Sequence, residues 1–436
     1  MFEWSETDLM IRDAVRGFIA KEIRPNLDAL ESGEITPYPI IRKLFTEFGI
    51  DAMSRDNVEK MLAKERARAA GDATGGGNGA AGGSTPRGDG GEDDDEEGGS
   101  GDGLGGRDSM MAVVISELAG ACMGLVSALG VSLGLGATTI ASRGTLEQKE
   151  RWLPGIMTME KVASWAITEP DSGSDAFGGM RTYVRRDGDD YILNGRKTFI
   201  TNGPYADVMI VYAKLDEGDP SVGPRDRKVL TFVLDKGMPG LTQGTPFKKM
   251  GLHSSPTGEL FFDDVRLGRE RLLGGSEAGR GGDGKESARS SFTAERIGVA
   301  TMALGIIEEC RRLCIDYASE RTLWGQEIGR FQLIQLKLAK MEVARMNVQN
   351  MVFQSLERAR AGKPLSLAEA SAMKLYSSEA ATEVAMEAVQ LFGGNGYMSE
   401  YRVEQLARDA KSLMIYAGSN EIQVTHIAKG LLSPAG

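Results

Sequence analysis

The sequence predicts a mostly helical α+β protein of three parts: N-terminal helices, a small antiparallel β domain and a C-terminal helical bundle. Helical periodicity near the start, short β-rich runs in the middle and long amphipathic runs from about residue 292 onward predict this order. The 436 residues also exceed the size at which one hydrophobic core usually keeps growing. We therefore expect domains over residues 1–157, 158–272 and 273–436.

The N-terminal part begins with a helix start signal. Ser5 precedes Asp8 in the manner of a helix cap, and apolar residues then recur at helical spacing until Pro25. Residues 118–142 carry no charge and are long enough to cross a bilayer, but they are rich in Gly and Ser and bounded by charges. We expect two buried helices joined by a turn there, and no stable membrane span.

Residues 69–107 differ in composition from the rest of the chain. They are dominated by Gly, Ala, Ser and acids, including six consecutive acidic residues at 92–97. Such a segment buries too little apolar surface to offset the entropy of ordering it. We expect a disordered, solvated insertion, and favour a tolerated surface loop over an interaction tail because lengthening a flexible loop costs little.

The middle part predicts strands without long helices between them, which favours an antiparallel barrel or sandwich over a βαβ dinucleotide fold. Asn194-Gly195 is a hairpin signal. The β-rich runs are Tyr191–Leu193, Val208–Ala213, Val229–Leu234 and Leu260–Phe262. The long amphipathic runs that follow cover 294–318, 326–360 and 367–392.

Composition excludes several classes of function. The chain has 51 basic and 62 acidic residues, a net charge of −11, which disfavours nucleic acid and anionic membranes as partners. Two histidines, His253 and His426, exclude a multi-histidine metal site, and we expect no metal. The three cysteines, Cys122, Cys310 and Cys314, are expected to be buried free thiols. With an acidic N-terminus that lacks a leader pattern, these cysteines favour a cytoplasmic location.

The segment from Trp165 to Asp175 gathers small and hydroxyl residues around a Pro-Gly turn, a strip of donors that could hold a flavin or a pyrophosphate. Three further motifs follow in order: NGRKTFITNG, QLFGGNGY and RDAKSLMIYAGSNEIQ. Together with WAITEPDSGSDA they resemble the acyl-CoA dehydrogenases. The resemblance covers nearly all of the chain except the acidic insertion and roughly residues 274–288.

This resemblance implies an acyl-CoA dehydrogenase-like fold with a C-terminal four-helix bundle, and FAD as cofactor. It also implies an acyl-CoA substrate, from which two hydrogens are removed across Cα and Cβ to give the trans-2-enoyl-CoA. Electrons would pass to an electron-transferring flavoprotein, and the assembly would be a homotetramer or homodimer.

The resemblance also assigns residues. FAD contacts from the first motif are Trp165, Ile167 and Thr168. Ser174 is expected to meet the pantetheine arm of CoA, while Glu169 and Asp175 only shape the loop. The face presented to the isoalloxazine is Phe199, Ile200 and Thr201, with Phe where the family usually has Trp.

Further assignments lie in the C-terminal part. The family's contacts to the FAD pyrophosphate and adenine, which reach a neighbouring subunit, match Arg321, Phe331, Gln332, Gln390, Gly393 and Gly394. Two residues match positions that close over the cofactor, Ser419 and Glu421. Tyr416 and Gly418 are expected to bind substrate.

The base departs from the common pattern. Many members carry the catalytic Glu in Ile-Tyr-Glu-Gly, where this sequence has Ala417. A smaller branch, including isovaleryl-CoA and some long-chain dehydrogenases, carries the base on the first helix of the bundle, directly before an Arg. This position corresponds to Glu295, followed by Arg296, so we assign Glu295 as base and Arg296 as a supporting neighbour. The Ala417 N–H is kept as a donor to the thioester carbonyl.

Three other interpretations remain open at this stage. Glu295 alone is also compatible with a solvated carboxylate near a helix start. An acyl-CoA oxidase would keep the fold and the flavin but pass electrons to oxygen. A flavin-bound scaffold would have no turnover, with Ala417 marking a dead site.

Overall fold

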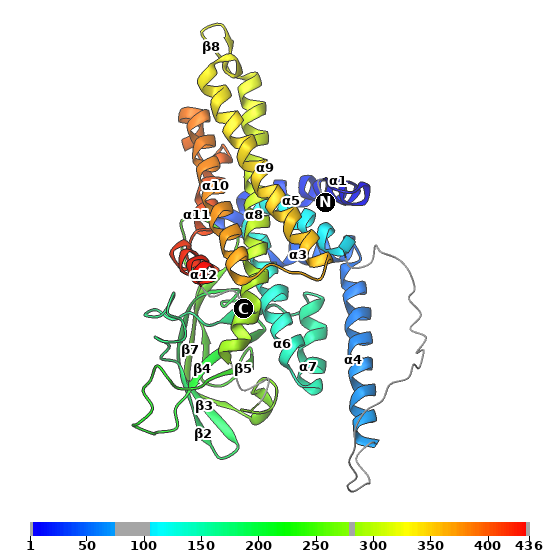
Figure 1. The fold of residues 1–436 in the computed structure, drawn as a ribbon, viewed down its shortest axis with the longest axis vertical. Helices are drawn as coiled ribbons and strands as arrows, with labels where there is room; N and C mark the ends of the chain where they lie inside the picture. Colours follow the sequence, from blue (N-terminus) through cyan, green and yellow to red (C-terminus); the bar gives the residue numbers. More distant parts are fainter. Residues whose placement is uncertain (1–2, 75–104, 279–283, 433–436) are drawn as a thin grey trace.

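The computed structural model describes residues 3–74, 105–278 and 284–432. The β domain lies at one end of the molecule and a long helical bundle extends to the other (Figure 1). Most of the expected insertion lies outside the described residues. Its first residues, 69–74, continue a helix, and its last, 105–107, begin another.

The N-terminal part is helical, as predicted. The Ser5 side chain accepts from the Asp8 N–H at 3.1 Å while the Asp8 carboxylate accepts from the Ser5 N–H at 3.0 Å, a reciprocal cap. Pro25 lies in the 3₁₀ turn that ends this run. The elements are α1 (Glu6–Phe18), a π turn (Ile19–Ile23), a 3₁₀ turn (Arg24–Asn26), α2 (Leu27–Ser32), α3 (Tyr38–Glu47), α4 (Ile50–Thr74), α5 (Gly105–Gly130), the π turn η3 (Val131–Ala137), α6 (Thr138–Arg143) and α7 (Leu146–Met157).

The expectation of two buried helices joined by a turn after residue 118 is met in part. The Cys122 backbone inside α5 is non-helical (φ −159°, ψ 86°), so two helical stretches meet there at a kink, and the chain then continues through η3 directly into α6. The resulting helix over Asp108–Arg143 is long and apolar enough to span a membrane by length and composition. However, 72% of its most apolar window is buried inside the protein, as in the core helix of a globular fold.

The β domain contains one mixed sheet in the order β1-β4-β2-β3-β7-β6, with β5 also paired to β4. The expected antiparallel pairing is confirmed for β2 with β3, β3 with β7, β6 with β7 and β4 with β5, but β1 and β2 both run parallel to β4. Since β5 pairs along one edge of β4, β1 and β2 occupy successive parts of its other edge, and the long segments that return the chain to this edge permit parallel pairing. The strands are β1 (Ala163–Ala166), β2 (Tyr183–Asp187), β3 (Asp190–Thr201), β4 (Val208–Leu215), β5 (Val229–Asp235), β6 (Leu241–Gln243) and β7 (Thr257–Leu267).

The hairpin predicted at Asn194-Gly195 is also wrong. The turn between β2 and β3 lies at Gly188, whose φ of 64° suits a tight turn. Asn194 and Gly195 lie inside β3, where the register with β7 shifts. The Asn194 amide is occupied by Asp264, donating to its carboxylate at 2.8 Å and accepting from its N–H at 3.0 Å. A Cβ on Gly195 would lie 2.6 Å from the Thr182 hydroxyl, so the glycine serves close packing instead of a turn.

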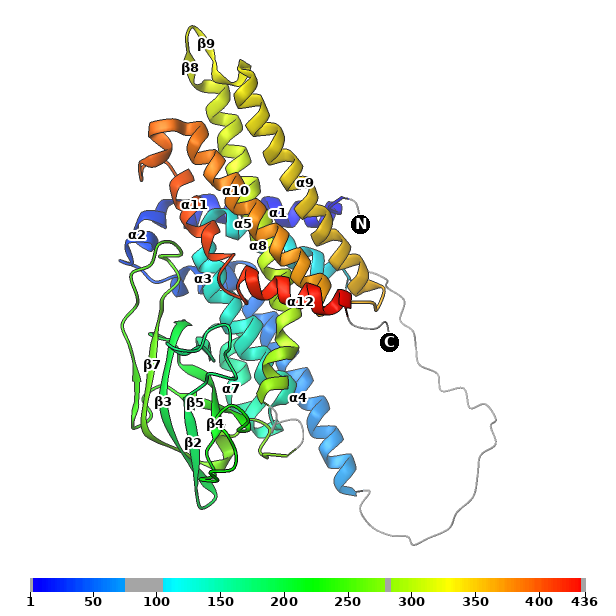
Figure 2. The same ribbon diagram turned by 60° about the vertical axis from the view of Figure 1, so that its left-hand side comes forward.

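The C-terminal part is a helical bundle, as predicted. The run expected from 326 starts as a helix only at Gln332, because β9 and a 3₁₀ turn precede it. Helices α8 and α9 form a long hairpin with β8 and β9 at its tip, and α12 lies across the bundle near its middle (Figure 2). The elements are α8 (Gly284–Glu320), β8 (Thr322–Leu323), β9 (Gln326–Glu327), α9 (Gln332–Arg360), α10 (Leu367–Phe392), the 3₁₀ turn η7 (Gly393–Tyr397), α11 (Val403–Ser412) and α12 (Asn420–Leu432).

Helices α5 and α8 touch backbone to backbone. A Cβ on Gly305 would lie 2.0 Å from the Ser116 carbonyl oxygen, and one on Gly120 would lie 2.8 Å from the Gly305 oxygen. Two consequences follow: neither position accepts a side chain without moving a helix, and α8 is held at a fixed distance from the central helix. The cysteines are buried and free, as expected.

Candidate active site

A buried ion pair between β3 and the loop after β1 holds this loop in place. Lys197 on β3 is fully buried and donates to the Glu169 carboxylate at 2.8 Å and to the Ile167 carbonyl at 3.1 Å. Glu169 also accepts from the Arg181 and Thr182 N–H groups, at 2.6 and 3.0 Å. The expectation that Glu169 shapes the loop therefore has a definite physical basis.

Burial affects the two members of this pair differently. It lowers the pKa of Lys197 to about 8, although Glu169 opposes the shift. Burial alone raises the pKa of Glu169, but Lys197 and the backbone donors outweigh it, so this pKa lies below its usual value.

The first two predicted flavin motifs lie next to each other. The Thr198 N–H on β3 donates to the Thr168 carbonyl at 2.9 Å, which joins the end of β3 to the loop after β1. Trp165 is partly buried and donates to the Tyr212 hydroxyl at 3.1 Å. Ser174, predicted to meet the pantetheine arm, is exposed on the same loop.

Phe199 has an unusual conformation. Its φ is 57°, its ring is 66% exposed, and the nearest aromatic ring, that of Phe247, is 5.9 Å away. Ile200 beside it is 2% exposed and Thr201 is partly buried. A left-handed backbone costs a non-glycine residue about 1–2 kcal/mol, so an exposed aromatic ring held this way indicates a functional surface.

Asn202 joins this surface to the N-terminal domain. Its side chain donates to the Ala128 and Ala163 carbonyls, both at 2.9 Å, and accepts from the Tyr38 hydroxyl at 3.0 Å. Ala128 belongs to α5, so the end of β3 is bound to the central helix.

The next residue back on α5, Ser127, leads to the predicted base. Burial and the nearby Glu295 carboxylate raise the pKa of Tyr416, while the Ser127 hydroxyl lowers it, so Ser127 and Glu295 both lie near the Tyr416 side chain. The Tyr416 hydroxyl also lies 3.9 Å from the Met302 sulfur on α8. The end of β3, helix α5 and the Tyr416–Glu295 pair are therefore connected through successive contacts between elements of all three domains.

Glu295 lies on α8 with its surface only partly exposed. Burial raises its pKa to about 7, against the opposing effects of Arg296 and Lys374. A carboxyl group with a pKa near the working pH is suited to general base catalysis.

Arg296 is buried, 2% exposed, and its guanidinium lies 5.7 Å from the centre of the Phe292 ring. Its Nε and one terminal nitrogen have no hydrogen-bond partner in the described parts of the chain. Burial lowers its pKa and Glu295 raises it again, so the two residues form one electrostatic unit.

Close to Arg296 lies a turn with two consecutive left-handed residues, Ala417 at φ 57° and Gly418 at φ 78°; a Cβ on Gly418 would lie 3.7 Å from a terminal nitrogen of Arg296. Gln423 on α12 donates to both of their carbonyls, at 3.0 and 2.6 Å. The Ala417 N–H donates to no acceptor within residues 3–74, 105–278 and 284–432. It is therefore available to an oxygen from outside the chain.

Another predicted set is not brought to this region within one chain. These residues lie at the far end of the bundle, near the tip that carries β8 (Figure 1). The Arg321 N–H donates to the Tyr317 carbonyl at 2.9 Å, and Tyr317 stacks on Phe392 at 4.0 Å. The set comprises Arg321, Phe331, Gln332, Gln390, Gly393 and Gly394. By contrast, Ser419 and Glu421 follow the Ala417 turn closely, and the Ser419 side chain lowers the pKa of Glu421.

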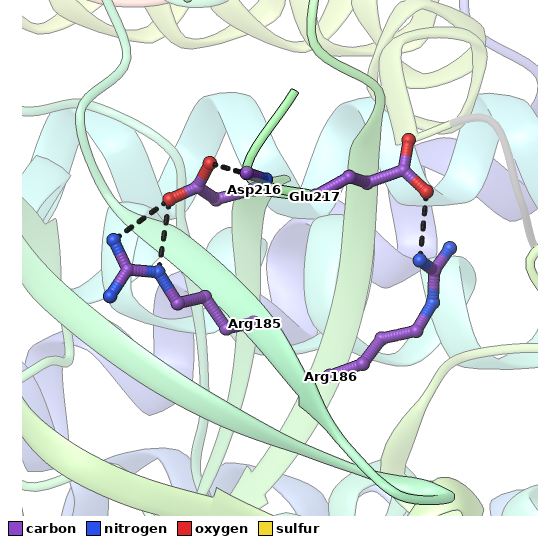
Figure 3. A pocket seen from close by; sticks show the side chains of 5 residues that line it. Arg185, Arg186, Asp216 and Glu217 are labelled. Carbon is purple, nitrogen blue, oxygen red and sulfur yellow. Dashed lines mark hydrogen bonds and ion pairs between the residues drawn. The ribbon is translucent and has the colours of Figure 1, made fainter. Parts of the chain in front are cut away.

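A hollow on the surface of the β domain lies between Arg185, Arg186, Asp216 and Glu217 (Figure 3). Its charges neutralise one another: Arg185 donates to Asp216 at 3.0 Å and Arg186 to Glu217 at 2.7 Å. It therefore has little charge left to attract a ligand.

Sequence reasoning missed three residues of the site: Asn202, Lys374 and Gln423. Lys374 is the most informative, because it is fully buried and points at the Ala417 turn. A single charge within the small and apolar run ASAMKLYSS was a usable signal.

The three parts of the fold match three family models. They are described as the acyl-CoA dehydrogenase C-terminal, middle and N-terminal domains and match residues 282–432, 164–265 and 94–160. A short-chain specific acyl-CoA dehydrogenase of Megasphaera elsdenii is 37% identical over 333 residues, 76% of this chain and 84% of that protein. An acyl-CoA dehydrogenase of Bacillus subtilis (strain 168) is 33% identical over 431 residues, 98% of both chains.

Solved structures give the same result. Butyryl-CoA dehydrogenase from Megasphaera elsdenii has a TM-score of 0.79 at 31% identity, over 99% of this chain and 100% of that one. A glutaryl-CoA dehydrogenase from Mycobacterium smegmatis in complex with FADH2 scores 0.78 at 25% identity, over 99% and 96%. A structure described as the electron transferring flavoprotein of Acidaminococcus fermentans scores 0.76 at 30% identity, over all of both chains.

The fold is thus that of an oxidoreductase built from two helical domains around a β domain. The chain belongs to the acyl-CoA dehydrogenase family.

Proposed function

We propose that this protein removes the α-proton and β-hydride of an acyl-CoA thioester to form the trans-2-enoyl-CoA, with Glu295 as the base and FAD as the cofactor. The observation that carries the proposal is a buried Glu295 carboxyl, whose pKa is raised to about 7 and which acts on Tyr416, together with the Ala417 N–H of the next residue, which donates to no acceptor in the described parts of the chain. Abstraction of a thioester α-proton needs both a base and a donor for the carbonyl oxygen.

The residues present fit a flavin. The exposed Phe199 ring, held in a left-handed backbone beside Thr201 and the Thr168 loop, offers an aromatic surface bordered by hydroxyl groups. Trp165 adds a second aromatic side chain at the end of β1. Bound FAD would supply the acceptor for the β-hydride.

In this mechanism the protein supplies orientation and electrostatics. The Ala417 N–H donates to the thioester carbonyl, which acidifies the α-proton, and Glu295 accepts that proton. Arg296 and Lys374 favour the ionised form of Glu295 before the reaction. Because the donor comes from the backbone, Ala at 417 keeps it while the carboxylate is contributed by α8.

The test is Glu295→Gln, which keeps the size and polarity of the side chain but cannot accept a proton. We expect acyl-CoA to perturb the flavin spectrum as in the unmodified protein, while anaerobic flavin reduction slows by about 10²–10⁴-fold. Glu308→Gln is the matched control, since Glu308 lies on the same helix and burial raises its pKa as well. Its rate should stay within twofold of the unmodified protein.

Normal flavin reduction in Glu295→Gln would show that the base lies elsewhere. No reduction in the unmodified protein with any acyl-CoA in a panel would favour the scaffold interpretation. Combining Glu295→Ala with Ala417→Glu is expected to restore part of the activity, because either anchor can direct a carboxylate at Cα.

The electron acceptor is proposed to be an electron-transferring flavoprotein. Membership of this family and the structural match to the protein from Acidaminococcus fermentans support this choice. Reduced enzyme mixed with such a flavoprotein should reoxidise much faster than in air-saturated buffer. The reverse order of rates would favour the oxidase alternative.

We also propose a homotetramer in which one subunit completes the flavin site of another. Arg321, Gln332 and Gln390 belong to the part of the bundle near the β8 tip, whereas Phe199 belongs to β3 in the β domain, so a second chain would be needed to bring them together around one cofactor (Figure 1). Light scattering on the flavin-loaded protein should give a tetramer mass. A flavin-replete monomer would refute the shared site.

A further inference from the structure

Lys374 lies in the middle of α10 and is fully buried. Its ammonium donates to the Gly418 carbonyl at 3.0 Å and to the Asn420 side-chain oxygen at 2.9 Å. Ser378, one turn further along α10, donates to the same Asn420 oxygen at 3.1 Å. A lysine is rarely fully buried unless it is paired, and the two acceptors here belong to the Ala417 turn and to Asn420, the first residue of α12.

The hydrogen bonds of Lys374 stabilise the Ala417–Gly418 turn, whose backbone is left-handed at both residues. Ala417 is left-handed without being glycine, which costs about 1–2 kcal/mol and requires support from its surroundings. That support comes from Gln423, which binds the Ala417 and Gly418 carbonyls, and from Lys374, which binds the Gly418 carbonyl. The Ala417 N–H lies in the peptide plane that precedes the Ala417 carbonyl, so these hydrogen bonds act on its direction through the backbone angles of Ala417 and Gly418, which they help to hold in the left-handed region.

The charge of Lys374 acts on the base. The ionisable groups that face it are Glu295 and Arg296 on α8, Glu421 on α12 and Glu379 on its own helix. Burial lowers the pKa of Lys374 to about 8, so at neutral pH the ammonium is mostly charged. The coupling is mutual, because Lys374 lowers the pKa of Glu295 and Glu295 raises that of Lys374.

We propose that Lys374 is a positioning residue for α-proton abstraction, which orients the Ala417–Gly418 turn through the Gly418 carbonyl and keeps Glu295 ionised by its positive charge. The proposal rests on Glu295 being the base. It assigns two separable effects to one side chain. The hydrogen bond affects the plateau rate of flavin reduction, and the charge affects the pH dependence of that rate.

The experiment measures anaerobic flavin reduction by a saturating acyl-CoA between pH 5.5 and 9 in flavin-loaded protein. Lys374→Met removes charge and hydrogen bonds at similar length. We expect its acid limb to move up by about one pH unit, and its plateau rate to fall by roughly tenfold, at the low end of effects for a group that acts through others. Gln423→Leu removes neutral hydrogen bonds to the same turn and should lower the plateau without moving the limb.

Lys374→Arg keeps the charge and is the second variant, used also if the Met variant does not retain flavin. Its limb should stay within 0.3 pH units or so of the unmodified protein, because the shift follows charge. An unchanged profile in Lys374→Met refutes the proposal. A lower plateau with an unmoved limb in that variant, or a limb shift in Lys374→Arg or Gln423→Leu as large as that in Lys374→Met, reduces Lys374 to a structural residue.

Glu295→Gln separates failure of this inference from failure of the proposed base. If the acid limb and rate survive in Glu295→Gln, the base assignment is wrong and the inference falls with it. If Glu295→Gln stops reduction while Lys374→Met behaves as the unmodified protein, the base stands and only the inference is overturned.

Discussion

Replacing Lys197 by Met should strongly destabilise the protein. Lys197 is fully buried and Glu169 is 5% exposed, so the substitution leaves a carboxylate in the interior without its cation. Removing one partner of such a pair typically costs about 3–5 kcal/mol. Glu169 would keep its two backbone donors, at 2.6 and 3.0 Å, which places the expected loss near the lower end of that range.

The same substitution should loosen the predicted flavin loop. Lys197 also donates to the Ile167 carbonyl, so its loss frees the backbone beside Thr168. The flavin-to-protein ratio after dialysis should therefore fall together with the urea midpoint followed by circular dichroism. Because the pKa of Glu169 lies below its usual value in the folded protein, the stability it contributes is present at neutral pH and is lost on acidification through that pKa. The difference between the two proteins should shrink accordingly in acid.

Two controls make the prediction sharp. Arg266→Met breaks an exposed contact with Asp187 and Asp190 on the same sheet and should change the midpoint far less, since exposed pairs are screened by solvent. Combining Lys197→Met with Glu169→Leu removes both charges and should recover most of the loss. The reasoning is refuted if Lys197→Met costs no more than Arg266→Met, or if the double variant is as unstable as the single one.

Three other predictions concern stability and the site together. Glu295→Gln should be more stable than the unmodified protein at pH 8 by up to about 3 kcal/mol. A carboxyl whose pKa is raised in the folded protein adds stability in acid, and this stability is lost as the pH rises through about 7. Thermal melts at pH 8 and at pH 4.5 should therefore show that the gain of the Gln variant vanishes in acid. Asn202→Gly should lower the free energy of unfolding in urea by about 2–4 kcal/mol, because it leaves buried polar groups unpaired. Asn202→Ala should lower it by about 1 kcal/mol more, because the φ of 65° strains a non-glycine residue. Equal losses in the two variants would argue against backbone strain. Phe199→Gly should gain about 1 kcal/mol by relieving the left-handed backbone while flavin retention falls, and unchanged flavin content would remove Phe199 from the site.

The large features of the fold were predictable because they depend on local pattern. The long runs of the C-terminal bundle and the cap at Ser5 follow from helical periodicity and side-chain chemistry within a few residues. The parallel pairing of β1 and β2 with β4 was not predictable, because it depends on which strand edge the chain returns to after long connecting segments. Asn194-Gly195 misled for a similar reason: the partner that occupies Asn194 is Asp264, 70 residues away.

The residues of the candidate site also fall into those that sequence motifs indicate and those that depend on contacts distant in sequence. Glu295 could be proposed as the base from sequence because it precedes Arg296 and because Ala417 lacks a carboxylate. Lys374 was missed because the atom it binds is a backbone carbonyl 44 residues away, and backbone atoms leave no mark in a sequence. Gln423 and Asn202 act on backbone carbonyls as well, so the residues that aim the site are less visible than those proposed to do its chemistry.

The backbone contact between α5 and α8 gives one position unusual mechanical leverage. Gly305 lies ten residues from Glu295, about 15 Å along a stiff helix. A methyl group at Gly305 would push against the Ser116 carbonyl and tilt α8 about that contact. Because Glu295 is on the same helix at a distance from the contact, the tilt would displace its carboxyl group. A genetic screen for lost turnover would then recover substitutions at Gly305 among those of chemical residues, although this position has no side chain and never meets the substrate.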